Sequence, residues 1–343
     1  MRIRCSAPLL FVSLSSFAAQ SPSGSPAAPD VSVAKAHEEL EHNHADAAIA
    51  MLQQMAATQP EPKGVEHELG IAYYRTGKLM EAKRAFATAV QQDSQDIESV
   101  QMEGLTLYRL GQPAAAIPFL ERVRQWTPEA GTDANYVLGL CYLNASRYAD
   151  ARKSFAEQYG EDPDSGAAWL LLATMLNHAN LPRQAAVEAQ KAVDLAPTLP
   201  MAHFLLGEVA LLDSNIDEAI KEFQAEQRIN PDYAPIYDRL GDAYLRVNRL
   251  DDAQQALTKA LSLDMSSTGP FILMGRVLLR RQDARTAIMY LQHAEKMDPA
   301  NYVTHASLAQ AYRMTGEEDE AKRENELAAK NHLDNELKLQ PVN

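Results

Sequence analysis

Apolar residues recur three and four positions apart along most of the chain, which is the spacing of one face of an α-helix. Two clear runs are Trp169, Leu172 and Leu176, and Tyr237, Leu240 and Tyr244. Turn-forming residues and prolines separate such runs at regular intervals. The pattern therefore predicts a succession of amphipathic helices joined by short turns.

The helical pattern has a period of 34 residues and occurs nine times. Position 20 of the period is alanine in every repeat, and position 8 is glycine in six of them. Because a glycine inside a helix costs about 1 kcal/mol relative to alanine, this register indicates helices that approach too closely for a larger side chain. The repeats begin at Pro29, Lys63, Ile97, Thr132, Gly166, Pro200, Ala234, Thr268 and Tyr302.

Two further positions divide each repeat into two helices. Turn-forming residues stand at position 15, where several of them tolerate a left-handed backbone. Prolines follow the second helix of most repeats and cannot continue it, because they lack an amide hydrogen. The turn residues are Asn43, Gly77, Gly111, Ser146, Asn180, Ser214, Asn248 and Gly316.

This unit resembles the tetratricopeptide repeat, whose length and whose small and large positions match those given above. The resemblance covers Pro29 to about Asn335, with the first repeat the weakest match. It implies an all-α, right-handed superhelical solenoid of about nine 34-residue helix-turn-helix repeats. The charged segment 317–338 is expected to cap the exposed end of the solenoid.

The expected organisation is a signal peptide (1–18), a flexible linker (19–28), the solenoid (29–335) and a C-terminal tail (336–343). Arg2 and Arg4 precede an apolar stretch that ends in small residues, the order that is typical of a secretory signal. We therefore expect an exported protein, periplasmic or extracellular. The alternative is a frayed or misassigned start of the chain.

The resemblance also implies a concave wall formed by positions 2, 5, 9 and 12 of each first helix. Large apolar side chains on a solvent-facing wall are typical of a partner site. The alternative is that tight winding buries part of this stripe against neighbouring repeats. The apolar candidates are Ile71, Tyr74, Leu105, Tyr108, Tyr136, Leu140, Leu143, Leu170, Phe204 and Leu211.

Toward the C-terminus the same wall becomes charged, with Glu208, Asp238 and Asp242 followed by Arg276 and Arg313. Like charges four residues apart on a helix repel, so we expect a protein or peptide partner with an apolar segment and basic residues. The alternative is a solvated face in which the nearby Arg239 and Arg246 neutralise the acids.

Composition excludes several other functions. The chain has 343 residues and a net charge of −14, which disfavours nucleic acid as a partner. Its two cysteines cannot form a four-thiolate zinc site, and no apolar run is long enough to span a membrane. His37 and His42 are five residues apart, whereas a helical zinc pair needs a spacing of four.

The leading hypothesis is therefore a non-catalytic interaction scaffold that needs no cofactor and no metal and belongs to an exported or envelope-associated assembly. Two alternatives stay open. The first is an accessory or catalytic subunit of a glycosyltransferase or protease system, and the second is a carrier of hydrophobic ligands. The sequence does not specify the oligomeric state.

Overall fold

The structure is a computed structural model that describes residues 31–126 and 132–339. The predicted signal peptide and linker lie outside the described residues, as does the end of the predicted tail. Within these ranges every regular element is an α-helix, as the periodicity predicts. None of these helices is both long enough and apolar enough to cross a membrane.

The described residues form two helices in each of the nine repeats, and the first repeat has two helices like the others. The last helix continues to Leu339, four residues beyond the predicted end of the solenoid at 335. The helices are α1 (Val31–Glu41), α2 (Ala45–Ala56), α3 (Val65–Arg75), α4 (Leu79–Gln92), α5 (Ile97–Arg109), α6 (Pro113–Trp126), α7 (Thr132–Asn144), α8 (Tyr148–Tyr159), α9 (Gly166–His178), α10 (Pro182–Leu195), α11 (Ala202–Leu212), α12 (Ile216–Ile229), α13 (Ala234–Arg246), α14 (Leu250–Leu263), α15 (Thr268–Arg280), α16 (Ala284–Met297), α17 (Tyr302–Thr315) and α18 (Glu318–Leu339).

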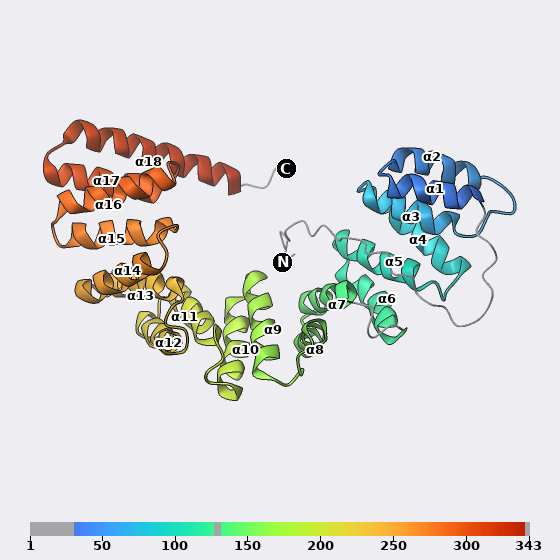
Figure 1. The fold of residues 1–343 in the computed structure, drawn as a ribbon, viewed down its shortest axis with the longest axis horizontal. Helices are drawn as coiled ribbons and strands as arrows, with labels where there is room; N and C mark the ends of the chain where they lie inside the picture. Colours follow the sequence, from blue (N-terminus) through green and yellow to red (C-terminus); the bar gives the residue numbers. More distant parts are fainter. Residues whose placement is uncertain (1–30, 127–131, 340–343) are drawn as a thin grey trace. The chain divides into compact units, whose positions relative to one another are not determined.

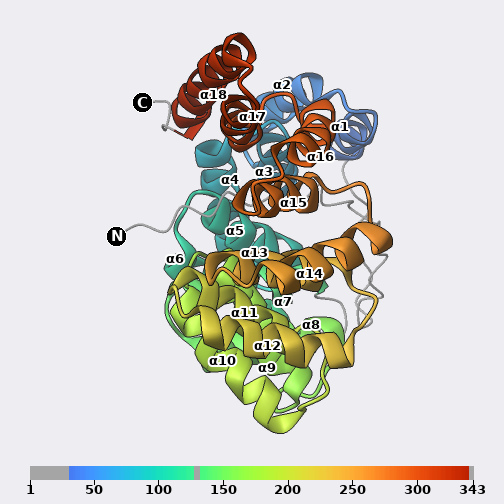
Figure 2. The ribbon, with the colours of Figure 1, turned by 90° about the vertical axis from the view of Figure 1, so that its left-hand side faces the viewer.

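The helices divide into two compact units, one with α1–α9 and the other with α10–α18. Inside each unit a helix packs against its neighbours in the sequence, as Figure 1 shows for α13 to α18 and Figure 2 shows from the side. First helices of successive repeats also contact each other directly, from α1 through α3 and α5 to α7 in one unit and from α11 through α13 and α15 to α17 in the other. These odd-numbered helices form a wall in each unit, and the predicted partner residues lie on them, except Leu170 on α9.

The turn between the two helices of a repeat has the same backbone conformation in all nine repeats. Position 15 has a positive φ throughout, which confirms the eight predicted turn residues. The ninth is Gln282, with φ +64°, a residue type that the sequence pattern does not mark as a turn former. The full set is Asn43, Gly77, Gly111, Ser146, Asn180, Ser214, Asn248, Gln282 and Gly316.

Position 8 is small because a large side chain from position 24 of the same repeat fills the space above it. A Cβ added to Gly207 would lie 2.6 Å from the ring of Phe223, and one added to Gly70 would lie 2.5 Å from Phe86. Both rings are fully buried. In the fifth repeat Ala173 stands at position 8, and position 24 is then Ala189. In the repeats that have glycine at position 8, the side chain at position 24 occupies the space that a Cβ would need.

Candidate functional site

Four of the ten apolar candidates on the wall helices belong to the core. Ile71, Leu105, Leu143 and Leu211 are between 2 and 8% exposed, so they offer little surface to a partner. This matches the alternative in which neighbouring repeats bury part of the stripe. The six that keep partial exposure are Tyr74, Tyr108, Tyr136, Leu140, Leu170 and Phe204.

The partly exposed tyrosines Tyr74 and Tyr136 are held by neighbouring side chains. The Arg109 guanidinium lies 4.4 Å from the centroid of the Tyr74 ring, a cation–π contact between adjacent wall helices. The Tyr136 ring lies 5.9 Å from that of Phe155, and its hydroxyl is 3.9 Å from Met175 Sδ. A partner would therefore meet rings in fixed positions and would lose little rotamer entropy in ordering them.

Phe204 contributes as much to packing as to the surface. Its ring lies 5.5 Å from that of Phe223 and 5.6 Å from that of Tyr233. Replacing it would disturb the helix pair α11–α12 whether or not a partner binds there. Phe204 is therefore a poor probe of binding.

The three acidic residues of the wall are paired with the arginines that the alternative interpretation named. Arg239 Nε lies 2.5 Å from Glu208 Oε1, and Arg246 Nη2 lies 2.7 Å from Asp242 Oδ2. The Arg239 Nη1 atom is also 3.5 Å from Asp238 Oδ2. Most of the predicted acidic charge is thus neutralised within the wall.

Asp238 is the exception among these acids, because its second oxygen is unsatisfied. Asp238 Oδ1 is buried and has no hydrogen-bond partner. Burial raises the pKa of this carboxyl, and the negative charges of Asp242 and Glu208 raise it further, although Arg239 acts in the opposite direction. A Cβ at Gly269 on the next wall helix would lie 3.3 Å from the unsatisfied oxygen. The free oxygen thus lies beside a residue without a side chain.

Arg276 on α15 and Arg313 on α17 are exposed. Neither makes an ion pair or a side-chain hydrogen bond with a residue that the structure describes. They lie on adjacent helices that contact each other. They are the charged candidates on this wall with the greatest capacity to bind an outside acceptor.

A Ser–His–Asp combination occurs between α3 and α5, but its geometry is structural. Ser99 Oγ and Asp96 Oδ2 lie 2.8 and 3.2 Å from the same ring nitrogen, Nδ1 of His67. A catalytic triad instead places the serine and the carboxylate on opposite ring nitrogens. Ser99 is also fully buried and donates its hydroxyl hydrogen to Asp96, so it cannot act as a nucleophile.

Cys141 belongs to the core of its repeat. Its side chain is fully buried, and burial raises the pKa of the thiol to about 12. A thiol with so little thiolate at neutral pH is a poor nucleophile and a poor metal ligand.

Two polar arrangements are not evident from the sequence pattern. Glu226 is fully buried on α12, and its carboxylate accepts hydrogen bonds from Met201 N at 2.7 Å and Phe204 N at 3.3 Å at the start of α11. The signal for it is the replacement of the usual alanine at position 27. The second arrangement pairs His305 on α17 with Glu324 on α18, and both side chains are buried.

Comparison with family models confirms the resemblance. Three models described as tetratricopeptide repeat match residues 107–174, residues 67–130 and 183–234, and residues 234–265. The chain belongs to the tetratricopeptide repeat family.

Curated relatives match only parts of their own lengths. A peroxisomal targeting signal receptor of Candida albicans is 25% identical over 57% of this chain and 35% of the receptor. Anaphase-promoting complex subunit 3 of Schizosaccharomyces pombe is 20% identical over 71% of this chain and 36% of the subunit. The chain thus spans about a third of the length of these two proteins.

Solved structures with similar folds include MamA, at 18% identity and a TM-score of 0.43 over 48% of this chain and 95% of that protein. The Cut9–Hcn1 complex of APC/C matches at 16% identity and a TM-score of 0.45, over 83% of this chain and 56% of the solved chain. Because both scores are below 0.5, the fold assignment rests on the helices described above.

Proposed function

We propose that this chain is a non-catalytic scaffold that binds a protein segment on the wall formed by α11, α13, α15 and α17. The observation that carries the proposal is the pair of exposed arginines, Arg276 and Arg313, which lie on contacting wall helices and make no ion pair with a residue that the structure describes. A segment with acidic side chains would pair with both guanidinium groups. The curated relatives include a peroxisomal targeting signal receptor and a subunit of the anaphase-promoting complex, which supports the same general role.

The structure also weighs on the two alternative functions. A carrier of hydrophobic ligands needs an accessible apolar surface. Four of the predicted apolar residues are buried and cannot contribute to it, namely Ile71, Leu105, Leu143 and Leu211. The serine, histidine and cysteine groups considered above lack the exposure and geometry of an active site. A role as an accessory subunit of an enzyme remains compatible with a scaffold.

We further propose that the scaffold is exported and acts in an envelope-associated or extracellular assembly. The support is the order of basic, apolar and small residues in 1–18. Mass spectrometry of the mature chain from its native cells tests this, because export predicts an N-terminus close to residue 19 in an envelope or secreted fraction. An intact Met1 in the cytosol would refute it.

The binding surface is tested by reversing the charge of both arginines in one variant, Arg276→Glu with Arg313→Glu. The variant and the unmodified chain are each used for affinity capture from the native envelope fraction. We expect the variant to capture about tenfold less of the partner, or even less, than the unmodified chain does. This decrease corresponds to the loss of one or two charge-assisted contacts.

The matched control reverses two exposed basic residues of the second helix α16, Arg285→Glu with Lys296→Glu. This control changes the net charge equally but leaves the wall intact. Equal loss of capture in both variants would refute the proposed surface, as would undiminished capture by the wall variant. Helical content and thermal midpoint are measured for all chains, to confirm that each variant is folded.

A further inference from the structure

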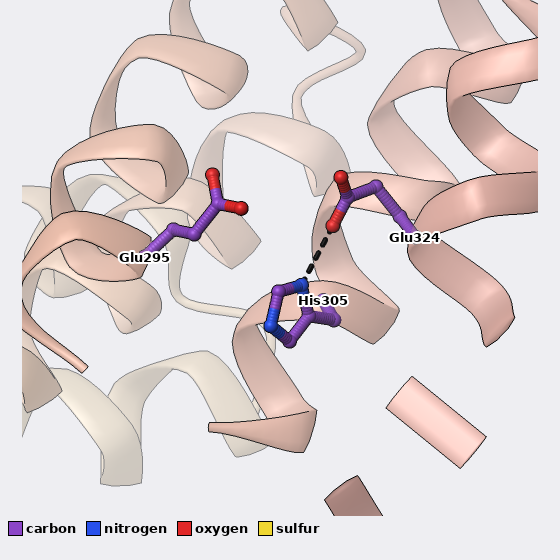
Figure 3. Close-up of side chains that lie close together, drawn as sticks. All are labelled: Glu295, His305 and Glu324. Atoms are coloured by element: carbon purple, nitrogen blue, oxygen red, sulfur yellow. Dashed lines mark hydrogen bonds and ion pairs between the residues drawn. The ribbon is translucent and has the colours of Figure 1, made fainter. Parts of the chain in front are cut away.

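Three potential metal-binding side chains meet where the last three helices pack together. Glu295 extends from α16, His305 from α17 and Glu324 from α18, as Figure 3 shows. One ligand atom from each residue lies within 4.8 Å of the other two. His305 is 2% exposed and Glu324 is 1% exposed, so the cluster lies at a protected helix junction.

The orientation of His305 is suited to metal binding through Nδ1. Its Nε2 atom lies 2.9 Å from the carbonyl oxygen of Pro299 and donates a hydrogen bond to it. Histidines that bind metals usually direct the second ring nitrogen to such an acceptor, which fixes the tautomer and the ring. Nδ1 is then directed at Glu324, with Oε2 at 2.6 Å.

The pairing of His305 with Glu324 does not explain why a second carboxylate, that of Glu295, lies close to both. An imidazolium at His305 would balance Glu324, whose other oxygen also accepts a hydrogen bond from Arg323. Glu295 brings a second carboxylate to the pair (Figure 3), yet it makes no hydrogen bond or ion pair with any residue that the structure describes. The charge of Glu295 also acts on His305 and on Arg323, and a cation bound between the two carboxylates would offset their mutual repulsion.

The sixth repeat provides an internal comparison. His203 and Glu222 occupy the same two positions of the repeat as His305 and Glu324, and their Nδ1 and Oε2 atoms are again 2.6 Å apart. The residue that corresponds to Glu295 is Val193. The histidine–glutamate pair therefore recurs as a packing feature, and the second carboxylate is added only where the eighth repeat packs on the ninth.

We propose that His305, Glu324 and Glu295 bind a divalent transition metal, with Zn²⁺ the ion best suited to one imidazole and two carboxylates. The metal replaces the proton between Nδ1 and Glu324 Oε2, and this proton is released to solvent. With Zn–N and Zn–O distances of about 2.1 Å and a tetrahedral angle, the two atoms would separate to about 3.4 Å. The bound ion connects α16, α17 and α18 and holds the terminal helix on the solenoid.

The experiment is calorimetric titration of the chelator-treated full chain with ZnCl₂, together with thermal unfolding at each metal concentration. We expect one Zn²⁺ to bind and to raise the thermal midpoint. Glu295→Gln should weaken that binding event about tenfold or more and should abolish the rise in the midpoint. Because Glu295 is half-buried and makes no hydrogen bond or ion pair with a described residue, this variant is expected to fold as the unmodified chain does.

His203→Gln is the matched control, because it removes the corresponding histidine of the sixth repeat and should leave zinc binding unchanged. Exposed histidines such as His42 and His44 are present in every variant, so any weak binding to them persists in Glu295→Gln. Absence of zinc binding by the unmodified chain would overturn the proposal. So would an isotherm that Glu295→Gln leaves unchanged, or one that His203→Gln reduces as much as Glu295→Gln does.

Discussion

Gln224 on α12 donates a hydrogen bond to the hydroxyl oxygen of Tyr244 on α13, with the two atoms 2.9 Å apart. The bond crosses from one repeat to the next, between position 25 and position 11. The same two positions are joined at three other junctions, by Gln53 with Tyr73, Glu121 with Tyr142, and Gln292 with Tyr312. Adjacent repeats in each unit are thus joined by directed polar contacts as well as by apolar packing.

Tyr244→Phe should lower the free energy of unfolding by about 1 kcal/mol, because it removes one partly buried hydrogen bond and keeps the ring. Chemical denaturation followed by circular dichroism measures the change. In a double-mutant cycle with Gln224→Ala, the coupling energy should account for most of that loss. Strictly additive effects would show that the bond contributes nothing to the junction.

Gly207→Ala should destabilise the chain by about 1–3 kcal/mol, because the added methyl group overlaps the buried ring of Phe223. The fifth repeat has Ala173 and Ala189 at the same two positions, and removing the ring with Phe223→Ala should relieve the overlap. The double variant is therefore expected to be more stable than the sum of the two single changes predicts. Thermal and urea unfolding of the four chains test this, and additivity would contradict it.

Glu226→Ala should cost about 2–3 kcal/mol, because the backbone amides of Met201 and Phe204 would lose their common acceptor. Glu226→Gln keeps one acceptor oxygen and should cost less. Hydrogen exchange provides a local readout, since protection should fall first in the opening turn of α11. Uniform loss of protection over all helices of that unit would argue against a local capping role.

The pair of His67 and Asp96 should make the free energy of unfolding depend on pH, both in the acidic range and above pH 6.5. Burial would raise the pKa of Asp96, but hydrogen bonds from His67 and Ser99 outweigh it and lower the pKa to about 2. The ionised carboxylate therefore stabilises the fold above its unfolded pKa of about 4, and this contribution is lost as the pH falls from about 4 to about 2.

Burial would lower the pKa of His67, but its hydrogen bond with Asp96 and the nearby carboxylates raise it above 6.5. The protonated imidazole therefore stabilises the fold below pH 6.5, and its contribution is lost as the pH rises through the folded pKa. Asp96→Asn keeps a capping side chain for α5 and should flatten both changes, by on the order of 1–2 kcal/mol at the acidic end. Unfolding free energies from pH 2 to pH 9 test this, and parallel profiles of the two chains would contradict it.

Gln282→Gly should stabilise the chain by about 1 kcal/mol, because Gln282 is held at φ +64° in an exposed turn where glycine avoids the steric cost. Asn248→Gly in the preceding repeat is a suitable comparison, because asparagine tolerates this conformation better and should gain less. The thermal midpoint measures both. A loss of stability in Gln282→Gly would mean that the entropy of the unfolded glycine exceeds the strain removed.

The sequence predicts the helices well because their signals are local and occur nine times. Position 15 shows both the strength and the limit of such signals. Glycine or asparagine there, as at Gly77 and Asn43, predicts a left-handed turn. Gln282 does not predict one, yet it adopts the same backbone conformation between its two helices. The apolar wall is predicted less well. Ile71 and Tyr74 belong to the same predicted stripe, yet only the packing of neighbouring helices decides that the first is buried and the second is not.

Charged positions depend even more on three-dimensional contacts. The sequence predicts that Arg239 can pair with the nearby acids. It does not predict that Asp238 Oδ1 is left without a hydrogen-bond partner. The meeting of Glu295 with His305 and Glu324 depends on three helices from two repeats. No spacing along the chain indicates it, because the same histidine–glutamate pair occurs in the sixth repeat without a third carboxylate.

The contact of Gly207 with Phe223 lies within one repeat, so gene duplication copies both partners together and each new repeat arrives with its paired helices already matched. The bond between Gln224 and Tyr244 spans two repeats, so duplication of one repeat does not copy both partners together. If residues 234–267 were deleted, Gln224 would meet Leu278 instead of a tyrosine. The internal packing of a repeat is thus inherited as a unit, whereas each junction has to be refined again whenever repeats are gained, lost or exchanged.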